Sequence, residues 1–72
     1  MENQEGMQPP VKVGDRLRLQ ISMKGKEGDG MGRIGTFIVI VSGTEVGQEY
    51  DVEIINVLNR YAFGKVIEDG SS

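Results

Sequence analysis

The amino-acid sequence predicts an all-β protein, a small closed barrel of five short antiparallel strands. Apolar and polar residues alternate along several stretches with the period of two that a half-buried strand requires. No stretch has the longer period of an amphipathic helix, and glycine-rich turns separate the alternating stretches, since 11 of the 72 residues are glycine. A closed barrel leaves no strand edge exposed, so five short strands favour this architecture.

A folded centre and two polar ends are expected along the chain. Residues 1–10 are polar, contain a Pro-Pro pair and have no apolar period, which predicts a flexible N-terminal arm. The barrel is expected over residues 11–68, followed by a short polar tail over residues 69–72. A single domain of this size should unfold with a free energy of about 3–5 kcal/mol, and it has little room for a large enclosed active site.

The first strand is predicted over residues 15–23, where the alternation is cleanest. Its apolar residues share one face: Leu17, Leu19, Ile21 and Met23. Its polar residues share the other face: Arg16, Arg18, Gln20 and Ser22. We therefore expect a basic outer face, with Met23 in the core at the end of the inner face.

Residues 25–35 form a glycine-rich loop that turns sharply before the next apolar run. Residues 30–35 match the dinucleotide-binding pattern G-x-G-x-x-G, which requires a helix directly after it. The six residues that follow are β-branched or aromatic in character and predict a strand, so we do not expect a dinucleotide site. The glycines are expected to allow a tight turn and close strand approach, with a positive φ at Gly30.

The second and third strands are predicted over residues 31–34 and 36–41, joined by a tight turn at Gly35. The third strand is apolar on both faces, which predicts a central position in the sheet. Turn residues then occupy positions 42–47.

The fourth strand alternates inner apolar side chains with outer acids. The inner residues are Tyr50, Val52 and Ile54, and the outer residues are Glu49, Asp51 and Glu53. The period breaks over residues 56–60, and a fifth strand is predicted over residues 61–67.

The residue inventory excludes several kinds of chemistry. The chain has no cysteine and no histidine, so it has no disulfide, no thiolate or imidazole metal site and no Cys/His or Ser/His/Asp nucleophile. We expect no enzyme activity, no cofactor and no metal. Without a signal-like or membrane-spanning apolar segment, we also expect a cytoplasmic protein, most simply a monomer with no membrane partner.

The net charge of −3 and the pI near 4.8 argue against a nucleic-acid partner unless the charges are separated in space. The acids concentrate over residues 45–53 and in the two ends, whereas the bases fall elsewhere: Lys12, Arg16, Arg18, Lys24, Lys26, Arg33, Arg60 and Lys65. A domain about 25 Å across exceeds the Debye length of about 8 Å, so acids on a far face would hardly cancel a basic patch. The alternative is that these charges are ordinary solvated strand faces.

The last strand places aromatic residues where a nucleobase could stack on them. Tyr61, Phe63 and Lys65 share one face, and the small residues Ala62 and Gly64 share the other. A lysine rarely points into a narrow barrel, so the aromatic pair is expected to face outward. The alternative is that both aromatic rings pack in the core and the side chain of Lys65 extends from there to the solvent. The alternation of side chains does not decide whether Phe37 faces the core or the surface, because its strand is apolar on both faces.

Several short motifs follow one another in a specific order. They are Val13-Gly14-Asp15, the basic first strand, Gly28-Asp29-Gly30-x-Gly32-Arg33-Ile34, an apolar strand opening at Phe37, Val46-Gly47 and Tyr61-Ala62-Phe63-Gly64-Lys65-Val66. In this order and spacing the chain resembles a TRAM domain. It resembles the stand-alone archaeal type, because essentially the whole predicted barrel is this one module.

The resemblance implies an OB-like barrel that binds RNA. Such domains are appended to tRNA- and rRNA-modifying methyltransferases and methylthiotransferases, or stand alone in a role similar to cold-shock RNA chaperones. The resemblance also favours Phe37 as part of the stacking surface. The RNA-binding residues expected from the motifs and charges are Arg16, Arg18, Lys24, Lys26, Arg33, Phe37, Arg60, Tyr61, Phe63 and Lys65.

We therefore expect an RNA chaperone that binds single-stranded or weakly structured tRNA, rRNA or mRNA with low sequence specificity. The alternative is an SH3-like protein-interaction barrel that uses the same aromatic residues to dock a peptide or an RNA-modifying enzyme.

Overall fold

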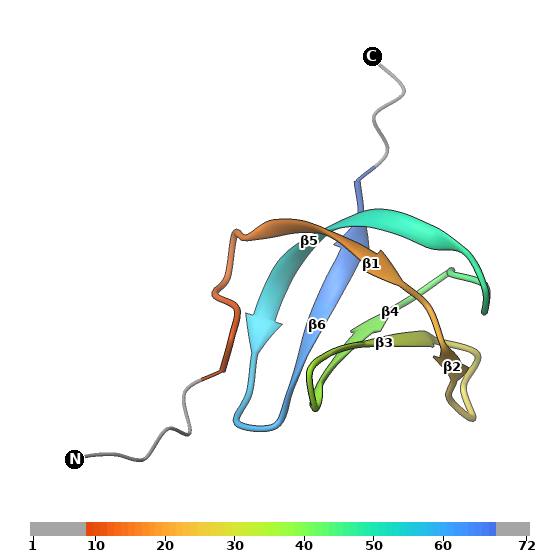
Figure 1. Cartoon of the computed structure of the whole chain (residues 1–72), viewed down its shortest axis with the longest axis horizontal. Helices are drawn as coiled ribbons and strands as arrows, with labels where there is room; N and C mark the ends of the chain where they lie inside the picture. Colours follow the sequence, from red (N-terminus) through yellow and green to blue (C-terminus); the bar gives the residue numbers. More distant parts are fainter. Residues whose placement is uncertain (1–8, 68–72) are drawn as a thin grey trace.

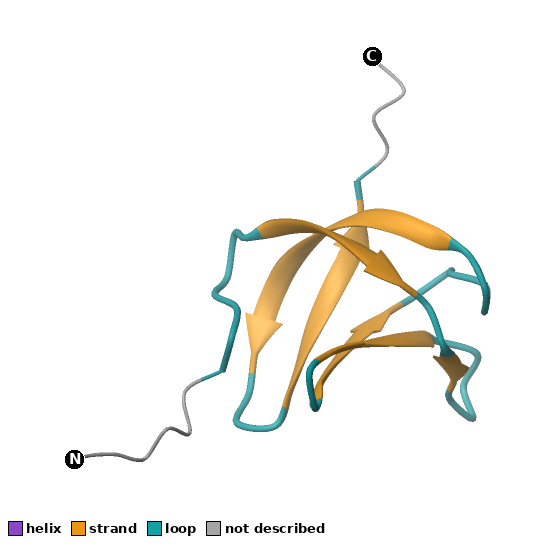
Figure 2. Cartoon of the chain, in the orientation of Figure 1, coloured by secondary structure: helices purple, strands orange, loops and turns teal. Residues whose placement is uncertain are grey.

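A computed structural model describes residues 9–67 of the chain, and within them the protein is all-β, as predicted (Figures 1 and 2). The six strands are β1 (Arg16–Gln20), β2 (Met23–Lys24), β3 (Gly30–Ile34), β4 (Phe37–Val41), β5 (Glu49–Val57) and β6 (Tyr61–Val66). No helix long and apolar enough to span a membrane occurs in residues 9–67. The expected tail and most of the expected arm lie outside the described residues.

The strands form one curled sheet in the order β1-β5-β6-β4-β3-β2, an open half-barrel (Figure 1). All neighbouring strands are antiparallel except β4 and β6, which are parallel. The expectation of a closed barrel of five strands is therefore wrong in both strand number and closure.

The physical reason is a break in the predicted first strand after Gln20. Ile21 leaves the ladder to β5 and exchanges backbone hydrogen bonds with the turn before β5, its N–H donating to the carbonyl of Gln48 at 2.9 Å. The next residue, Ser22, donates to the carbonyl of Met31 in β3 at 2.9 Å. A short connecting segment thus spans the gap between the two edges of the sheet, where a closed barrel would have a continuous strand ladder.

The β3–β4 hairpin confirms the predicted pairing across Gly35. Ile34 lies opposite Phe37, and Gly35 in the intervening turn has a φ of 63°. Glycine adopts this left-handed backbone conformation without a steric penalty. Strand β4 then lies between β3 and β6, which confirms its predicted central position.

Strand β5 is longer than expected and extends through Val57. Its pairing with β6 shifts by one position between Ile54 and Asn56, which marks a β-bulge at Ile55. The extra residue changes the alternation of inner and outer side chains, so Val57 is half-buried while Ile55 is exposed. The prediction that the strand ends before residue 56 is therefore wrong.

Nine apolar side chains form the core on the inner face of the sheet: Val11, Leu19, Ile21, Phe37, Val39, Val41, Val52, Ile54 and Ala62. Met23 is not among them, because β2 pairs with β3 and places Met23 opposite Met31 on the outer face. Met23 is 36% exposed, so its predicted place in the core is wrong.

Gly30 is required by close packing, and the expected positive φ is wrong. It lies buried in β3, and the positive φ angles within residues 25–35 belong to Gly28, at 91°, and Gly35, at 63°. A β-carbon on Gly30 would overlap the hydroxyl oxygen of the buried Thr44. That hydroxyl donates to the carbonyl of Val41 at 2.9 Å, so Thr44 is held in the space that a side chain at position 30 would need.

Candidate nucleic-acid interface

Strand β6 presents two aromatic rings on the outer face of the half-barrel. Tyr61 is 39% exposed and Phe63 is half-buried, whereas Ala62 and Gly64 between and after them are buried. Lys65 continues the same outer face and is exposed. This orientation agrees with the parity argument from the sequence; contact with RNA stays a prediction.

The two rings pack edge to face, with their centroids 5.6 Å apart and their planes at 80°. Such a pair contributes about 0.5–1.5 kcal/mol beyond the burial of its surface. Because the planes are nearly perpendicular, two bases stacked on Tyr61 and Phe63 could not remain parallel to each other. This arrangement suits bases that are separated from one another, as in an unpaired and locally unstacked strand.

Aliphatic side chains from neighbouring strands extend the aromatic surface. On β4, Ile38 lies opposite Tyr61 and Ile40 lies opposite Phe63, and both isoleucines are half-buried. On the far side of β4, Met31 lies opposite Ile40 and Met23 lies opposite Met31. We name this surface the outer apolar patch, and it consists of Met23, Met31, Ile38, Ile40, Tyr61 and Phe63.

The sequence reasoning missed the aliphatic part of the outer apolar patch. The signal was present in β4, which is apolar on both faces although only one face can point into the half-barrel. That pattern predicts a central strand, which is correct, and it also indicates an outer face without polar side chains.

Phe37 is a core residue, so the expectation that it provides a stacking surface is wrong. It is 8% exposed and begins the inner row of β4, which continues with Val39 and Val41. Because side chains alternate along a strand, its ring lies on the opposite face of the sheet from Ile38.

Two of the expected RNA-binding cations border the outer apolar patch directly. Arg33 on β3 lies opposite Ile38, in the same cross-strand row as Tyr61. Lys65 follows Phe63 on the outer face of β6, opposite Glu53. Arg60 directly precedes Tyr61 in the turn between the interior strands β5 and β6, whereas Lys26 lies in the β2–β3 loop at the β2 edge of the sheet.

All four of these cations are exposed, and none forms an ion pair within residues 9–67. Lys24 differs, because its Nζ lies 3.3 Å from Oε1 of Glu45. The structure therefore brings Arg33, Arg60 and Lys65 near the aromatic rings, but not Lys24 or Lys26.

The arginines of β1 form a ladder of ion pairs with the acids of β5. The register places Arg16 opposite Glu53 and Arg18 opposite Asp51. Arg16 Nε lies 3.7 Å from Glu53 Oε1, and Arg18 Nη1 donates to Asp51 Oδ1 at 3.0 Å. Arg18 Nε also lies 3.4 Å from Glu49 Oε1. We name these five residues the ion-pair ladder.

The ion-pair ladder contradicts the expected separation of charges. The acids of β5 lie beside the basic strand and not on a far face of the domain. Hydrogen bonding to Glu49, followed by the charge and hydrogen bonding of Asp51, raises the pKa of Arg18 above its ordinary value. The guanidinium lies between two carboxylates, those of Glu49 and Asp51.

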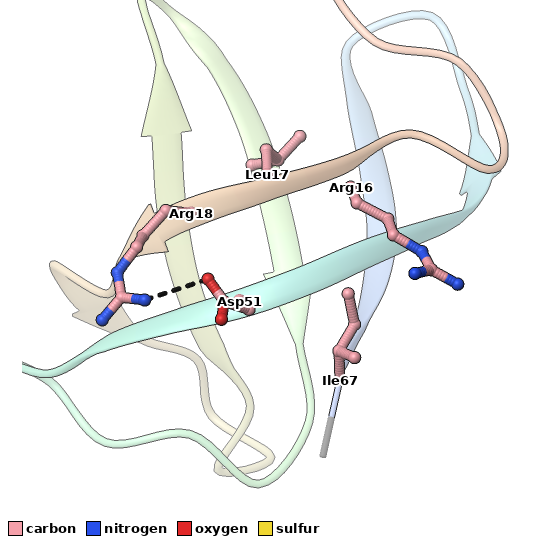
Figure 3. A pocket seen from close by; sticks show the side chains of 5 residues that line it. All are labelled: Arg16, Leu17, Arg18, Asp51 and Ile67. Carbon is pink, nitrogen blue, oxygen red and sulfur yellow. Dashed lines mark hydrogen bonds and ion pairs between the residues drawn. The ribbon is translucent and has the colours of Figure 1, made fainter. Parts of the chain in front are cut away.

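A pocket of about 380 Å³ lies beside the ion-pair ladder and is lined by Arg16, Leu17, Arg18, Asp51 and Ile67 (Figure 3). The Asp51 carboxylate points toward Arg18 in this view. No group of three or more acidic, cysteine or histidine side chains within residues 9–67 is arranged to hold a metal ion.

The fold and this surface define a small all-β domain whose curled sheet carries an exposed aromatic and aliphatic face bordered by cations. The chain belongs to the TRAM domain family, whose profile matches residues 10–67. This confirms the resemblance drawn from the sequence motifs.

Relatives of two sizes match the chain. An uncharacterized protein of Methanocaldococcus jannaschii is 36% identical over 58 residues, which cover 81% of this chain and 75% of that protein. The ribosomal RNA large subunit methyltransferase E of Haloarcula marismortui is 42% identical over 59 residues, which cover 82% of this chain but only 22% of the methyltransferase.

A solved structure agrees with the fold. The solution structure of a conserved protein from Methanococcus maripaludis superposes with a TM-score of 0.80 at 31% identity, covering 89% of this chain and 91% of that one.

Proposed function

We propose that this TRAM domain binds single-stranded or loosely structured RNA with little sequence preference. Membership of the TRAM family supports RNA as the ligand, as do relatives whose names describe ribosomal RNA methyltransferases. The similarity covers 22% of the Haloarcula methyltransferase and falls within the TRAM domain of this chain, so it does not extend to the rest of that enzyme. The function proposed here needs no catalysis.

The observation that carries the proposal is the outward-facing ring pair of the exposed Tyr61 and the half-buried Phe63, on the β6 side of the outer apolar patch. A base stacked on such a ring contributes about 1–3 kcal/mol whatever its identity, because every base has a π-face. Ile38 and Ile40 would contact the apolar edges of bases and sugars, while Arg33, Arg60 and Lys65 would contact phosphates on either side.

Binding of this kind would make the domain an RNA chaperone. A protein that binds only unpaired nucleotides shifts weak secondary structures toward their open form by its difference in affinity for the two states. Segments of tRNA, rRNA or mRNA would all qualify, because no base-specific contact is required. The domain would act as a monomer in the cytoplasm, without cofactor or hydrolysis.

A second candidate, docking of a protein partner such as an RNA-modifying enzyme, is favoured by one observation. The aliphatic side chains Met31, Ile38 and Ile40 make the outer apolar patch broader than two stacked bases require. Exposed apolar surface of this kind is also typical of protein interfaces. The two candidates differ in salt dependence, which is steep for phosphate contacts and shallow for an apolar interface.

Fluorescence anisotropy titrations against labelled oligo(U), a tRNA transcript and the matching DNA test the proposal. We expect saturable binding to oligo(U), and weaker binding to the base-paired regions of the tRNA. The variant Tyr61→Ala/Phe63→Ala should bind much more weakly than the parent protein. Parental affinity in this variant, with a native circular dichroism spectrum, would refute the role of the ring pair.

A further inference from the structure

The outer face of the half-barrel has two halves of different character. Strands β2, β3, β4 and β6 carry the outer apolar patch, and strands β1 and β5 carry the ion-pair ladder. The ion-pair ladder contains two arginines and three carboxylates, so its formal charge is −1. An RNA strand that extended onto this half would meet a surface that does not attract phosphate.

The carboxylates of the ion-pair ladder occupy the hydrogen-bonding groups that a phosphate would need. A guanidinium binds carboxylate and phosphate oxygens with the same planar set of N–H donors. In Arg18, Nη1 donates to Asp51 at 3.0 Å and Nε faces Glu49 at 3.4 Å. Asp51 also lines the neighbouring pocket together with both arginines, in the space that an incoming anion would enter (Figure 3).

We propose that the carboxylates of Glu49 and Asp51 hold Arg18 in place of a phosphate and prevent the β1–β5 half of the outer face from binding polyanions such as RNA. RNA is then confined to the half formed by strands β2, β3, β4 and β6. This inference rests on the proposed function for the identity of the polyanion. The acidic residues then determine the extent of the binding surface, and Arg18 is a latent phosphate contact.

The direct test is a double-mutant cycle in the full chain. Glu49→Gln/Asp51→Asn removes two negative charges while keeping the size of both side chains, and Arg18→Ala is introduced into the parent and into this variant. Each protein is titrated with labelled oligo(U) at several salt concentrations, and its circular dichroism melt is recorded. All substituted side chains are exposed, so we expect each variant to fold.

Release of Arg18 should raise affinity for oligo(U) about three- to fivefold at low salt, the range expected for an exposed charge contact. The slope of log K against log salt should become steeper by about 0.7 for one added phosphate contact. In Glu49→Gln/Asp51→Asn, the amide variant, Arg18→Ala should abolish the gain in affinity for oligo(U). In the parent protein, Arg18→Ala should change this affinity little. Two results would overturn the proposal. One is an equal loss of oligo(U) affinity on Arg18→Ala in the parent and in the amide variant, and the other is no gain of affinity in the amide variant.

Retention on immobilised heparin separates this inference from the proposed function. Heparin is a polyanion that offers no bases for stacking. If the parent protein fails to bind RNA, the proposed function fails, but heparin still tests the ion-pair ladder. The proposal is supported if Glu49→Gln/Asp51→Asn is retained more strongly than the parent and if adding Arg18→Ala abolishes this extra retention. Equal retention of the parent and of Glu49→Gln/Asp51→Asn contradicts it.

Discussion

The two phenylalanines of this chain lie on opposite faces of the sheet, because side chains alternate between the two faces along a strand. Phe37 begins the inner row of β4 and is 8% exposed. Phe63 lies on the outer face of β6, where it is half-buried and packs edge to face with Tyr61. The pair therefore provides a matched comparison, because truncation to alanine removes the same atoms from the core in one case and from the outer face in the other.

Phe63→Ala should lower the affinity for oligo(U) by about 1–3 kcal/mol, the contribution of one stacked base. Its cost in stability should stay near 1 kcal/mol, since the ring already contacts water. Phe37→Ala should remove about 3–5 kcal/mol of stability, comparable with the whole stability of a domain this small. Circular dichroism melts beside anisotropy titrations measure both quantities. An unfolded Phe63→Ala protein, or a Phe37→Ala protein that melts like the parent, would contradict these assignments.

At the scale of the strands, the sequence predicts those features that depend on neighbouring residues. The β3–β4 hairpin follows from an apolar run and a turn glycine next to each other, and the orientation of Tyr61 and Phe63 follows from the small residues between them. The end of β1 is different. Leu19, Ile21 and Met23 keep the period of two while the chain crosses from one edge of the sheet to the other, so periodicity does not reveal the break.

Features that depend on register could not be predicted from the local pattern. Arg18 and Asp51 are 33 positions apart in sequence, and only the β1–β5 register makes them neighbours. The bulge at Ile55 similarly shifts parity within a strand, which in sequence looks like the start of a loop. Phe37 could not be placed from the alternation of β4, because this strand is apolar on both faces, and the resemblance to the TRAM family favoured the wrong face.

Strand β3 depends on the absence of a side chain at Gly30. Gly30→Ala should be strongly destabilising, by about 1–3 kcal/mol, because the added methyl group overlaps the Thr44 hydroxyl and no flexible side chain can move away. Thr44→Ala alone should cost about 0.5–1.5 kcal/mol through loss of its hydrogen bond to Val41.

The two substitutions should be non-additive, since Thr44→Ala removes the atom that a methyl group at position 30 would meet first. Urea unfolding of the parent, the two single variants and the double variant gives this coupling. Strictly additive free energies of unfolding would show that the fit between Gly30 and Thr44 is not what requires glycine.

At the scale of the whole molecule, the strand order explains how an acidic protein can present a surface for a polyanion. The net charge is −3, but the acids of β5 are engaged with the arginines of β1 at one end of the sheet. The cations that border the outer apolar patch have no ion pair within residues 9–67. The separation of acids from bases that the sequence suggested is therefore absent, and within the described residues the structure separates paired charges on β1 and β5 from unpaired cations near β3, β4 and β6.

This arrangement predicts the salt dependence of RNA binding. With Arg33, Arg60 and Lys65 as the phosphate contacts, log K for oligo(U) should fall with log salt at a slope of about −2, since each contact on a single strand contributes about −0.7. Lys65→Gln should flatten the slope by about 0.7, whereas Lys12→Gln, which removes the same charge before β1, should leave it unchanged. A slope flatter than about −1 would favour the protein-docking function, because an apolar interface releases few counterions. A slope of about −3.5 would mean that Arg16 and Arg18 also contact phosphate, which would conflict with the pairing of Arg16 with Glu53 and of Arg18 with Glu49 and Asp51.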